Sequence, residues 1–215
     1  LPKLDSAQGR QARHCAVYGQ PTHCPSTHTR TVSSNQQDIS TWTAEDLSRA
    51  IHGRAVSCRE VMQATLRRID RFNPRSVAIV NLADEAQLLA QADARDAELS
   101  PRRSARGSRG WMHGFPQAIK DTGNAVGFPT TFGSPLLAKA WPAQDSIYVE
   151  RMKAAGSIII GKTNMPEFGL GSHTYNPLFG ATRNAWDDQV SAGGSSGGAA
   201  VALALRLLPV ADGSD

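Results

Sequence analysis

The sequence SAGGSSGGAA at positions 191–200 combines glycines and hydroxyl groups in a pattern that could do chemistry. Two adjacent serines lie between glycine pairs, directly before an apolar run at 201–208; the six central residues are Gly193, Gly194, Ser195, Ser196, Gly197 and Gly198. So many glycines in a short span indicate unusual dihedral angles or close backbone approach. The apolar run is predicted to be a helix, so the N–H groups before it could surround an anionic or oxyanionic atom. The alternative is a Gly/Ser turn that caps the helix.

A lysine at the end of an apolar stretch is the second candidate. Lys120 follows Ala118 and Ile119 and precedes Asp121. Burial favours the neutral amine, which can accept a proton near neutral pH. The alternative is an exposed Lys120–Asp121 ion pair at a strand end. The local sequence alone favours the ion pair.

A third motif satisfies the phosphate-loop pattern G-x-x-x-x-G-K-[ST] at positions 156–163. A phosphate-binding loop needs solvated residues between its glycines and a helix that starts at the lysine. Here the intervening residues are Ser-Ile-Ile-Ile, and Pro166 restrains a helix beginning at Lys162. The motif is therefore predicted to be a buried strand, and nucleotide hydrolysis is disfavoured.

The elements that must position these residues alternate between helices and apolar strands. Helices are predicted from Thr43 to Gly53, from a Ser57–Glu60 capping box to just before Asn73-Pro74, over 84–99, and from an Asp145 cap to about Ala155. Short strands are predicted over 77–82, 117–121 and 157–160. Continuous apolar strands alternating with helices indicate an α/β sheet covered on both faces.

Composition and charge limit the classes of function. The net charge of +4 comes mainly from basic residues in 1–40 and 101–109, and no aromatic residues interleave them for base stacking. No stretch approaches the roughly 18 apolar residues that span a bilayer. We therefore expect neither a nucleic-acid partner nor a membrane segment.

The cysteines indicate a reducing compartment, and we expect a cytoplasmic protein. Three cysteines do not form a disulfide framework. The pairs His14-Cys15 and His23-Cys24 lack metal-finger spacing, so no metal is expected. Residues 1–40 show no apolar period and are predicted to be a disordered or non-domain extension, a mitochondrial presequence being the alternative. The folded domain is predicted over 41–215.

The Gly/Ser loop and Lys120 belong to a longer series of motifs that resembles the amidase signature family. The series covers HGFP at 113–116, IKD at 119–121, PTTFGS at 129–134, AAG at 154–156, GKTNMPEF at 161–168, Asn176, FG at 179–180, TRN at 182–184, GGSSGG at 193–198 and ADGSD at 211–215. Members of this family hydrolyse or transfer linear amides with a Ser–Ser–Lys triad. The resemblance implies an α/β/α sandwich with a mixed sheet, of which this chain holds the N-terminal part.

The resemblance also assigns roles. Lys120 is similar to the family's general base and acid, and Ser195 to the bridging serine, whose peptide bond to Gly194 is cis in the family. A neutral Lys120 would accept a proton from Ser195, which accepts one from the nucleophile. Ser196 would support the loop by hydrogen bonding, with Asp215 helping to set the nucleophile's loop. The segment Gly169, Leu170 and Gly171 resembles the wall of the acyl site.

One part of the family pattern is missing from these residues. In the family the nucleophilic serine shortly follows the ADGSD stretch, and its loop donates the oxyanion N–H groups. Neither Ser196 nor Ser214 occupies that place. We therefore expect an amide hydrolase that forms an acyl-enzyme and needs no cofactor, and we expect residues 1–215 to be inactive alone.

Two other functions stay open. One is the tRNA-dependent amidotransferase subunit of the same family, although the segment 171–176 is more similar to free-standing amidases because the subunit usually has an acidic residue at the position of Tyr175. The other is a non-catalytic fragment whose exposed half-sheet pairs with another chain. The expected partner is a small-molecule amide, and a homodimer of the full-length protein is left open.

Overall fold

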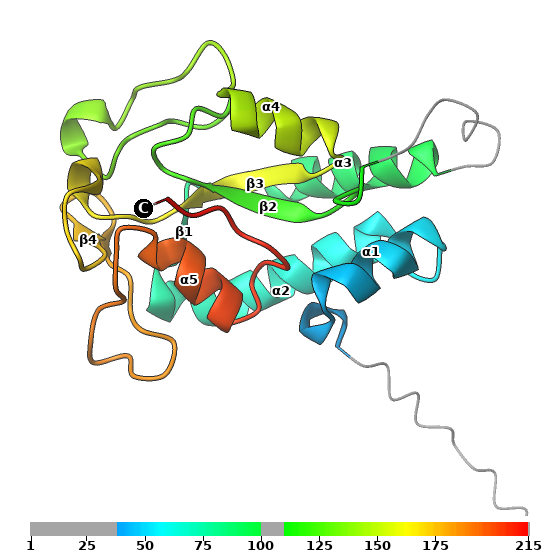
Figure 1. Cartoon of the computed structure of the whole chain (residues 1–215), viewed down its shortest axis with the longest axis horizontal. Coiled ribbons are helices and arrows are strands. Elements are labelled where there is room, and N and C mark those ends of the chain that lie inside the picture. Colours follow the sequence, from blue (N-terminus) through cyan, green and yellow to red (C-terminus); the bar gives the residue numbers. More distant parts are fainter. Residues whose placement is uncertain (1–37, 100–109, 215) are drawn as a thin grey trace, which may run out of the picture. The chain divides into compact units, whose positions relative to one another are not determined.

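A computed structural model of the chain describes residues 38–99 and 110–214 (Figure 1). The main helices are α1 (Ala44–His52), α2 (Cys58–Ser76), α3 (Glu85–Glu98), α4 (Ile147–Ala154) and α5 (Gly197–Ala204). The strands are β1 (Ile79–Val80), β2 (Pro116–Lys120), β3 (Ile158–Thr163), β4 (Tyr175–Asn176) and β5 (Gly180–Ala181). Short 3-10 turns occur at Ile39–Thr41, Pro135–Leu137 and Glu167–Gly169. The boundary between 1–40 and 41–215 stays a prediction.

The central sheet is mixed, as expected, with the strand order β1-β3-β2. Strand β3 pairs in parallel with β2 and antiparallel with β1. The parallel register shifts by one residue, because Gln117 faces Ile159 whereas Ala118 faces Gly161. Ile160 is the extra residue of this β-bulge. The bulge reverses which face each later residue of β3 presents, and it places Lys162 beside Ile119.

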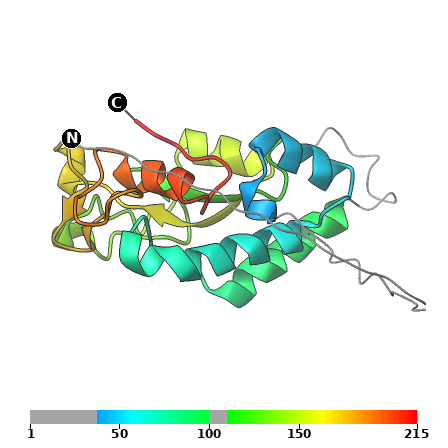
Figure 2. The same ribbon diagram turned by 90° about the horizontal axis from the view of Figure 1, so that it is seen from below.

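Helices cover both faces of this sheet, as Figure 1 shows for α4 on one side and α5 with α2 on the other. Val149 of α4 packs with Ile119 and Ile159 in one hydrophobic cluster. Ala118 and Ile160 belong to a larger cluster with residues of α1, α2, α3 and α5. Figure 2 shows α2 and α3 running alongside each other below the sheet. The architecture is the predicted α/β/α arrangement.

Local hydrogen bonds define the helix starts that the sequence predicted. The Thr43 hydroxyl caps α1 by accepting from Asp46 N. Ser57 and Glu60 form the capping box of α2. Asp84 accepts from Gln87 N at the start of α3. Each of these caps joins residues three positions apart, so the sequence alone carries the information.

Three of the predicted helices have wrong limits. Helix α2 continues through Pro74 to Ser76, because a proline in the last turn removes only one hydrogen bond. The Asn73 side chain holds the segment after the helix by accepting from the N–H groups of Ala78 and Ile79. Helix α4 has Ser146, not Asp145, as its N-cap residue. Helix α5 spans Gly197–Ala204, so it includes two glycines of the loop and ends before the predicted limit at Leu208. Within the described residues, every helix is too short or too polar to cross a bilayer.

Candidate active site

Lys120 is the centre of the candidate active site. It is the last residue of β2, and only 2% of its surface is exposed. Its Nζ lies 2.8 Å from the Oγ of Ser195, 2.9 Å from that of Ser196 and 2.6 Å from that of Ser214. Three hydroxyl groups match the three donors of an ammonium group. The structure therefore excludes the exposed Lys120–Asp121 ion pair as the role of this lysine.

Burial sets the protonation tendency of this amine. Desolvation lowers the pKa of Lys120 below its ordinary value, and the charge of the Asp212 carboxylate partly opposes that effect. The three hydroxyl groups around Nζ are neutral, so they accept its hydrogen bonds but supply no counter-charge to the ammonium form. A lysine with a lowered pKa has a larger neutral fraction near neutral pH and can accept a proton there.

The Gly/Ser loop brings Ser195 to this amine. The peptide bond between Gly194 and Ser195 is cis, as the family resemblance implies. The loop is fastened on one side, where Gly194 N donates to Ser172 O at 2.8 Å. On the other side Gly198 packs so closely that a Cβ atom there would lie 2.4 Å from Asn164 N and 2.6 Å from Ala78 O. The glycine at 198 is therefore required by close backbone approach.

Ser196 and Ser214 both contact the amine of Lys120, and sequence reasoning missed the contact of Ser214. Although Ser196 is the N-cap residue of α5, its side chain makes no capping hydrogen bond. Its Oγ accepts from Ser214 N at 3.0 Å and lies 3.3 Å from Ser214 O. Ser196 thus contacts both the amine of Lys120 and the backbone of Ser214, while its role as a support of the loop stays a prediction.

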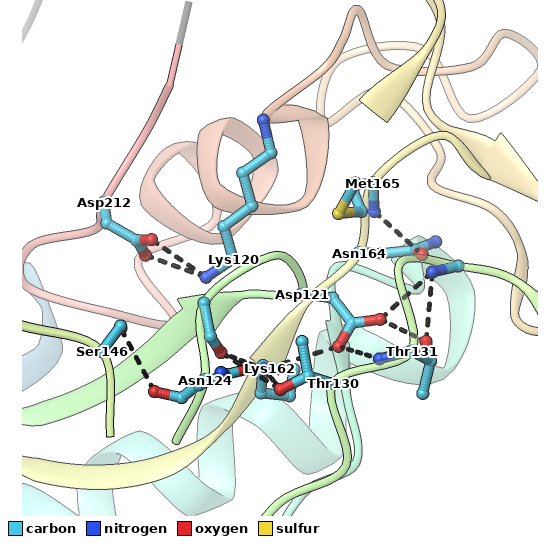
Figure 3. Close-up of polar contacts among 12 residues, drawn as sticks. Lys120, Asp121, Asn124, Thr130, Thr131, Ser146, Lys162, Asn164, Met165 and Asp212 are labelled. Carbon is cyan, nitrogen blue, oxygen red and sulfur yellow. Dashed lines mark hydrogen bonds and ion pairs between the residues drawn. The ribbon is translucent and has the colours of Figure 1, made fainter. Parts of the chain in front are cut away.

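Asp212 is a second residue that sequence reasoning missed. Its two carboxylate oxygens accept from the backbone N of Lys120 at 3.1 and 3.0 Å. Figure 3 shows the carboxylate at the backbone nitrogen and the lysine side chain running away from it toward α5. The ADGSD motif contained the signal, because an acidic residue near a buried lysine is a natural counter-charge.

The lysine of the phosphate-loop pattern is enclosed by protein. Lys162 is fully buried on the α4 side of the sheet, opposite to the side chain of Lys120 (Figure 3). Its Nζ donates to Gly123 O at 2.6 Å and lies 3.5 Å from an Asp121 oxygen. The Asp121 carboxylate also accepts from Thr131 and from Gly133 N. All six residues of β3 are buried, and the strand continues past the predicted limit at Ile160 to Thr163, so this lysine has no access to a phosphate.

The predicted acyl-site wall lies next to the Gly/Ser loop. Leu170 and Gly171 line an open cavity of about 450 Å³ that also includes Ser172, His173 and Tyr175. His173 forms a β-bridge with Gly193. Gly169 belongs to the 3-10 turn at one end of this segment. The structure thus brings the segment and the loop together, while the role as a substrate wall stays a prediction.

Some predicted residues lie outside the described part of the chain. These are Asp215 and the His-Cys pairs at 14–15 and 23–24. Within 38–99 and 110–214, no group of three or more His, Cys, Asp or Glu side chains could bind a metal ion.

Comparison with known proteins identifies the family. The amidase family model matches residues 60–215. This chain belongs to the amidase signature family. Among solved structures, the peptide amidase of Stenotrophomonas maltophilia aligns over 80% of this chain and 35% of its own length, at 35% identity with a TM-score of 0.70. A bacterial aryl acylamidase described as a member of the same family aligns over 79% of this chain and 34% of its own, at 30% identity with a TM-score of 0.71.

Curated relatives with similar sequences include components of a larger enzyme. The chain is 39% identical over 173 residues to a glutamyl-tRNA(Gln) amidotransferase subunit from Halorhodospira halophila, covering 80% of this chain and 34% of the relative. It is 42% identical over 170 residues to the corresponding subunit from Burkholderia ambifaria, covering 79% and 33%. The chain spans about a third of the length of these family members.

Proposed function

We propose that the full-length protein containing this chain hydrolyses a linear carboxylic amide to an acid and an amine or ammonia. The reaction passes through an acyl-enzyme, with Lys120 as general base and acid and Ser195 as the bridging serine. The observation that carries this proposal is the 2.8 Å separation between Lys120 Nζ and Ser195 Oγ in a buried setting. This is hydrogen-bonding distance, the requirement for proton transfer.

The proton path follows from these contacts. The neutral amine of Lys120 takes the proton of the Ser195 hydroxyl, which takes the proton of the nucleophilic serine as that oxygen bonds to the amide carbon. The C–N bond then breaks, and the proton returns through Ser195 to the leaving nitrogen. Water attacks the ester by the same path and releases the acid. The amide and one water molecule are consumed.

The experiment is an amide panel assayed with the full-length protein. Lys120→Met should lower kcat/KM by on the order of 10²–10⁴ because the proton acceptor is lost. Lys153→Met is the control, because Lys153 pairs with Asp145 away from the site. Hydroxylamine should trap the acyl group as a hydroxamate in the unsubstituted protein. Equal activity of the two variants would contradict the proposal.

Residues 1–215 alone should show no amide turnover. They contain Lys120 and Ser195, whereas the family's nucleophile lies in a segment that they do not include. Turnover by this chain alone, lost in Lys120→Ala, would show that another of its hydroxyls acts as nucleophile.

A second candidate is an amidotransferase subunit, favoured by the 39% identity to the Halorhodospira halophila protein. In that case the full-length protein would pass ammonia to a partner subunit that holds a misacylated tRNA. An assay of amide formation on misacylated tRNA, with and without added partner subunits, separates the two candidates. Free hydrolysis of small amides without tRNA-linked product supports the amidase.

A further inference from the structure

Asp212 is placed to act on Lys120 from the opposite end of that residue to the serines. We propose that Asp212 is a positioning residue of this site, which fixes the backbone of Lys120 through its main-chain nitrogen and carries a negative charge that acts on the amine from the other end of that residue. The functional part of this inference rests on the proposed function, in which Lys120 is the base. Asp212 itself touches neither Ser195 nor the reacting atoms.

The first support is the geometry at the edge of the sheet. Within the described residues, β2 pairs with β3 along one edge only. On the other edge, the backbone N–H of Lys120 donates to the side chain of Asp212 instead of to a strand. Both oxygens of Asp212 lie within 3.1 Å of that nitrogen. A hydrogen bond to a charged acceptor is stronger than one between neutral groups. The carboxylate therefore holds the last residue of β2 on the edge that faces away from β3.

The second support is that the same short segment touches both ends of Lys120. Asp212 accepts from the backbone nitrogen, and Ser214, two residues later, lies 2.6 Å from Nζ. Ser196 fastens Ser214 through its backbone N–H. A shift of Asp212 would therefore move the amine relative to the oxygen of Ser195. Proton transfer is sensitive to such shifts because it needs hydrogen-bonding distance.

The third support is the distribution of charge. Three ionisable groups on other elements interact with the Asp212 carboxylate: Lys120 on β2, Lys162 on β3 and Tyr148 on α4. Asp121 follows Lys120 directly in the sequence, but its carboxylate pairs with Lys162 and accepts a hydrogen bond from Thr131. Asp212 is thus the carboxylate whose charge opposes the desolvation of Lys120. Burial raises the pKa of Asp212, and the two lysines oppose that rise.

The consequence is a specific change in the titration of Lys120. The negative charge of Asp212 stabilises the charged form of Lys120, so its removal lowers the pKa of the lysine. Asp212→Asn keeps an oxygen that can accept from Lys120 N but loses the charge. The midpoint of the Lys120 titration should fall by on the order of one pH unit in this variant. Asp212→Glu retains the charge and should leave the midpoint near that of the unsubstituted protein.

The test is NMR of full-length protein labelled with ¹³C at the lysine ε-carbons. The Lys120 signal is assigned by its loss in Lys120→Met and followed against pH. Asp145→Asn is the matched control, because Asp145 also accepts a backbone N–H and pairs with a lysine, Lys153. The control should leave Lys120 unchanged. An unchanged or raised Lys120 midpoint in Asp212→Asn would overturn the proposal.

A second measurement needs no substitution of Asp212, in case Asp212→Asn does not fold. The carboxyl ¹³C signal of Asp212 in the unsubstituted protein should show an inflection at the Lys120 midpoint. Absence of that inflection would equally overturn the proposal. Neither spectrum requires turnover, so the absence of amidase activity would contradict the proposed function while leaving the Asp212 test intact.

An active full-length enzyme gives a third readout. The acid limb of the kcat/KM profile should move to lower pH in Asp212→Asn, because Lys120 loses its proton at lower pH. The value of kcat should fall more than KM rises, because the amine is less well placed. A role for Asp212 in stability alone would reduce the folded fraction without moving the acid limb.

Discussion

Two lysines on neighbouring strands of this protein have different surroundings. Lys120 and Lys162 lie one register position apart on β2 and β3, and the surface of each is at most 2% exposed. Desolvation lowers the pKa of both amines. Lys162 has Asp121 beside it and a backbone carbonyl as acceptor, whereas the amine of Lys120 meets hydroxyls. The first set of contacts suits a structural ion and the second suits a proton acceptor.

The buried Lys162–Asp121 pair should behave as a structural unit. Lys162→Met and Asp121→Asn should each lower the free energy of unfolding by about 3–5 kcal/mol, because each leaves an uncompensated buried partner. The double variant should lose less than the sum, because no lone charge then remains. Urea unfolding of the four proteins measures this coupling. Additive losses would contradict it.

The serine hydroxyls around Lys120 should differ in importance. In an active full-length enzyme, Ser195→Ala should lower kcat/KM by on the order of 10²–10⁴ because the proton relay is broken. Ser196→Ala should cost less, since Ser196 contacts the amine and Ser214 but has no part in the proton path of the proposed mechanism. Steady-state kinetics on one amide provides the comparison. Equal losses of kcat/KM in the two variants would contradict the different roles proposed for Ser195 and Ser196.

The start of α5 depends on close approach between elements. Gly198 lies against Asn164, which follows β3, and against Ala78, which precedes β1. Gly198 N also donates to Asn164 O at 3.0 Å. The helix therefore enters the fold where its backbone contacts the ends of two strands, and this contact sets the position of the serines before it.

Gly198→Ala should therefore unfold or strongly destabilise the chain. The added carbon would meet backbone atoms at 2.4–2.6 Å, which cannot move as a flexible side chain would. Gly193→Ala is the matched control in the same loop, because its added carbon would lie 3.9 Å from the nearest atom, Ser172 O. Thermal unfolding should show a large loss of stability for the first variant and a small change for the second.

Helix α2 is capped by a residue of another helix as well as by its own capping box. Asp96 of α3 accepts from the backbone N of Cys58 at 2.7 Å and of Arg59 at 3.1 Å. These N–H groups have no partner within α2, because they belong to its first turn. The contact also joins α2 to α3, which pack side by side.

Asp96→Ala should lower the free energy of unfolding by about 1–2 kcal/mol, the usual cost of losing a helix cap. Asp93→Ala on the same helix is the control, since Asp93 forms a surface ion pair with Arg59 and should cost less than about 1 kcal/mol. Urea midpoints compare the two variants. A larger loss for Asp93→Ala would contradict the capping role of Asp96.

At the scale of the whole molecule, His113 links the helical layer to the sheet. It lies just before β2, with 1% of its surface exposed. Its Nε2 lies 3.0 Å from Arg95 O of α3, and its ring centroid lies 6.0 Å from that of His52 in α1. Burial lowers the pKa of His113, opposed by its hydrogen bond to Arg95 and by the charge of Glu98.

This histidine should make stability depend on pH. Since its pKa is lower in the folded state, the unfolded chain binds more protons, and stability falls as the pH drops through the ordinary histidine value of about 6.5. The contribution is at most about 1.4 kcal/mol per pH unit. Urea unfolding between pH 5 and 8 measures the slope, which should be flatter in His113→Gln.

His173→Gln is the control for that experiment, because His173 is exposed. It should leave the pH dependence unchanged. If His113→Gln has the same slope as the unsubstituted chain, another group causes the loss of stability in acid.

The sequence alone determined the features that depend on neighbouring residues. The capping residues Thr43 and Ser57 were predicted because each cap joins residues three positions apart. The motif series also predicted the family, the mixed sheet and the pairing of Lys120 with Ser195. Motifs of a known family carry information about contacts between residues that are distant in sequence. Local propensities do not contain that information.

Only the tertiary structure decided the features that depend on contacts between distant segments. The bulge at Ile160 places Lys162 opposite to the face that simple alternation from Ile158 and Ile160 would assign. Asp212 lies 92 residues from Lys120 in sequence, and Asp96 lies 38 from Cys58. Hydrogen bonds of this kind form after the elements pack, so the free energy that favours them is absent from any local stretch of the chain.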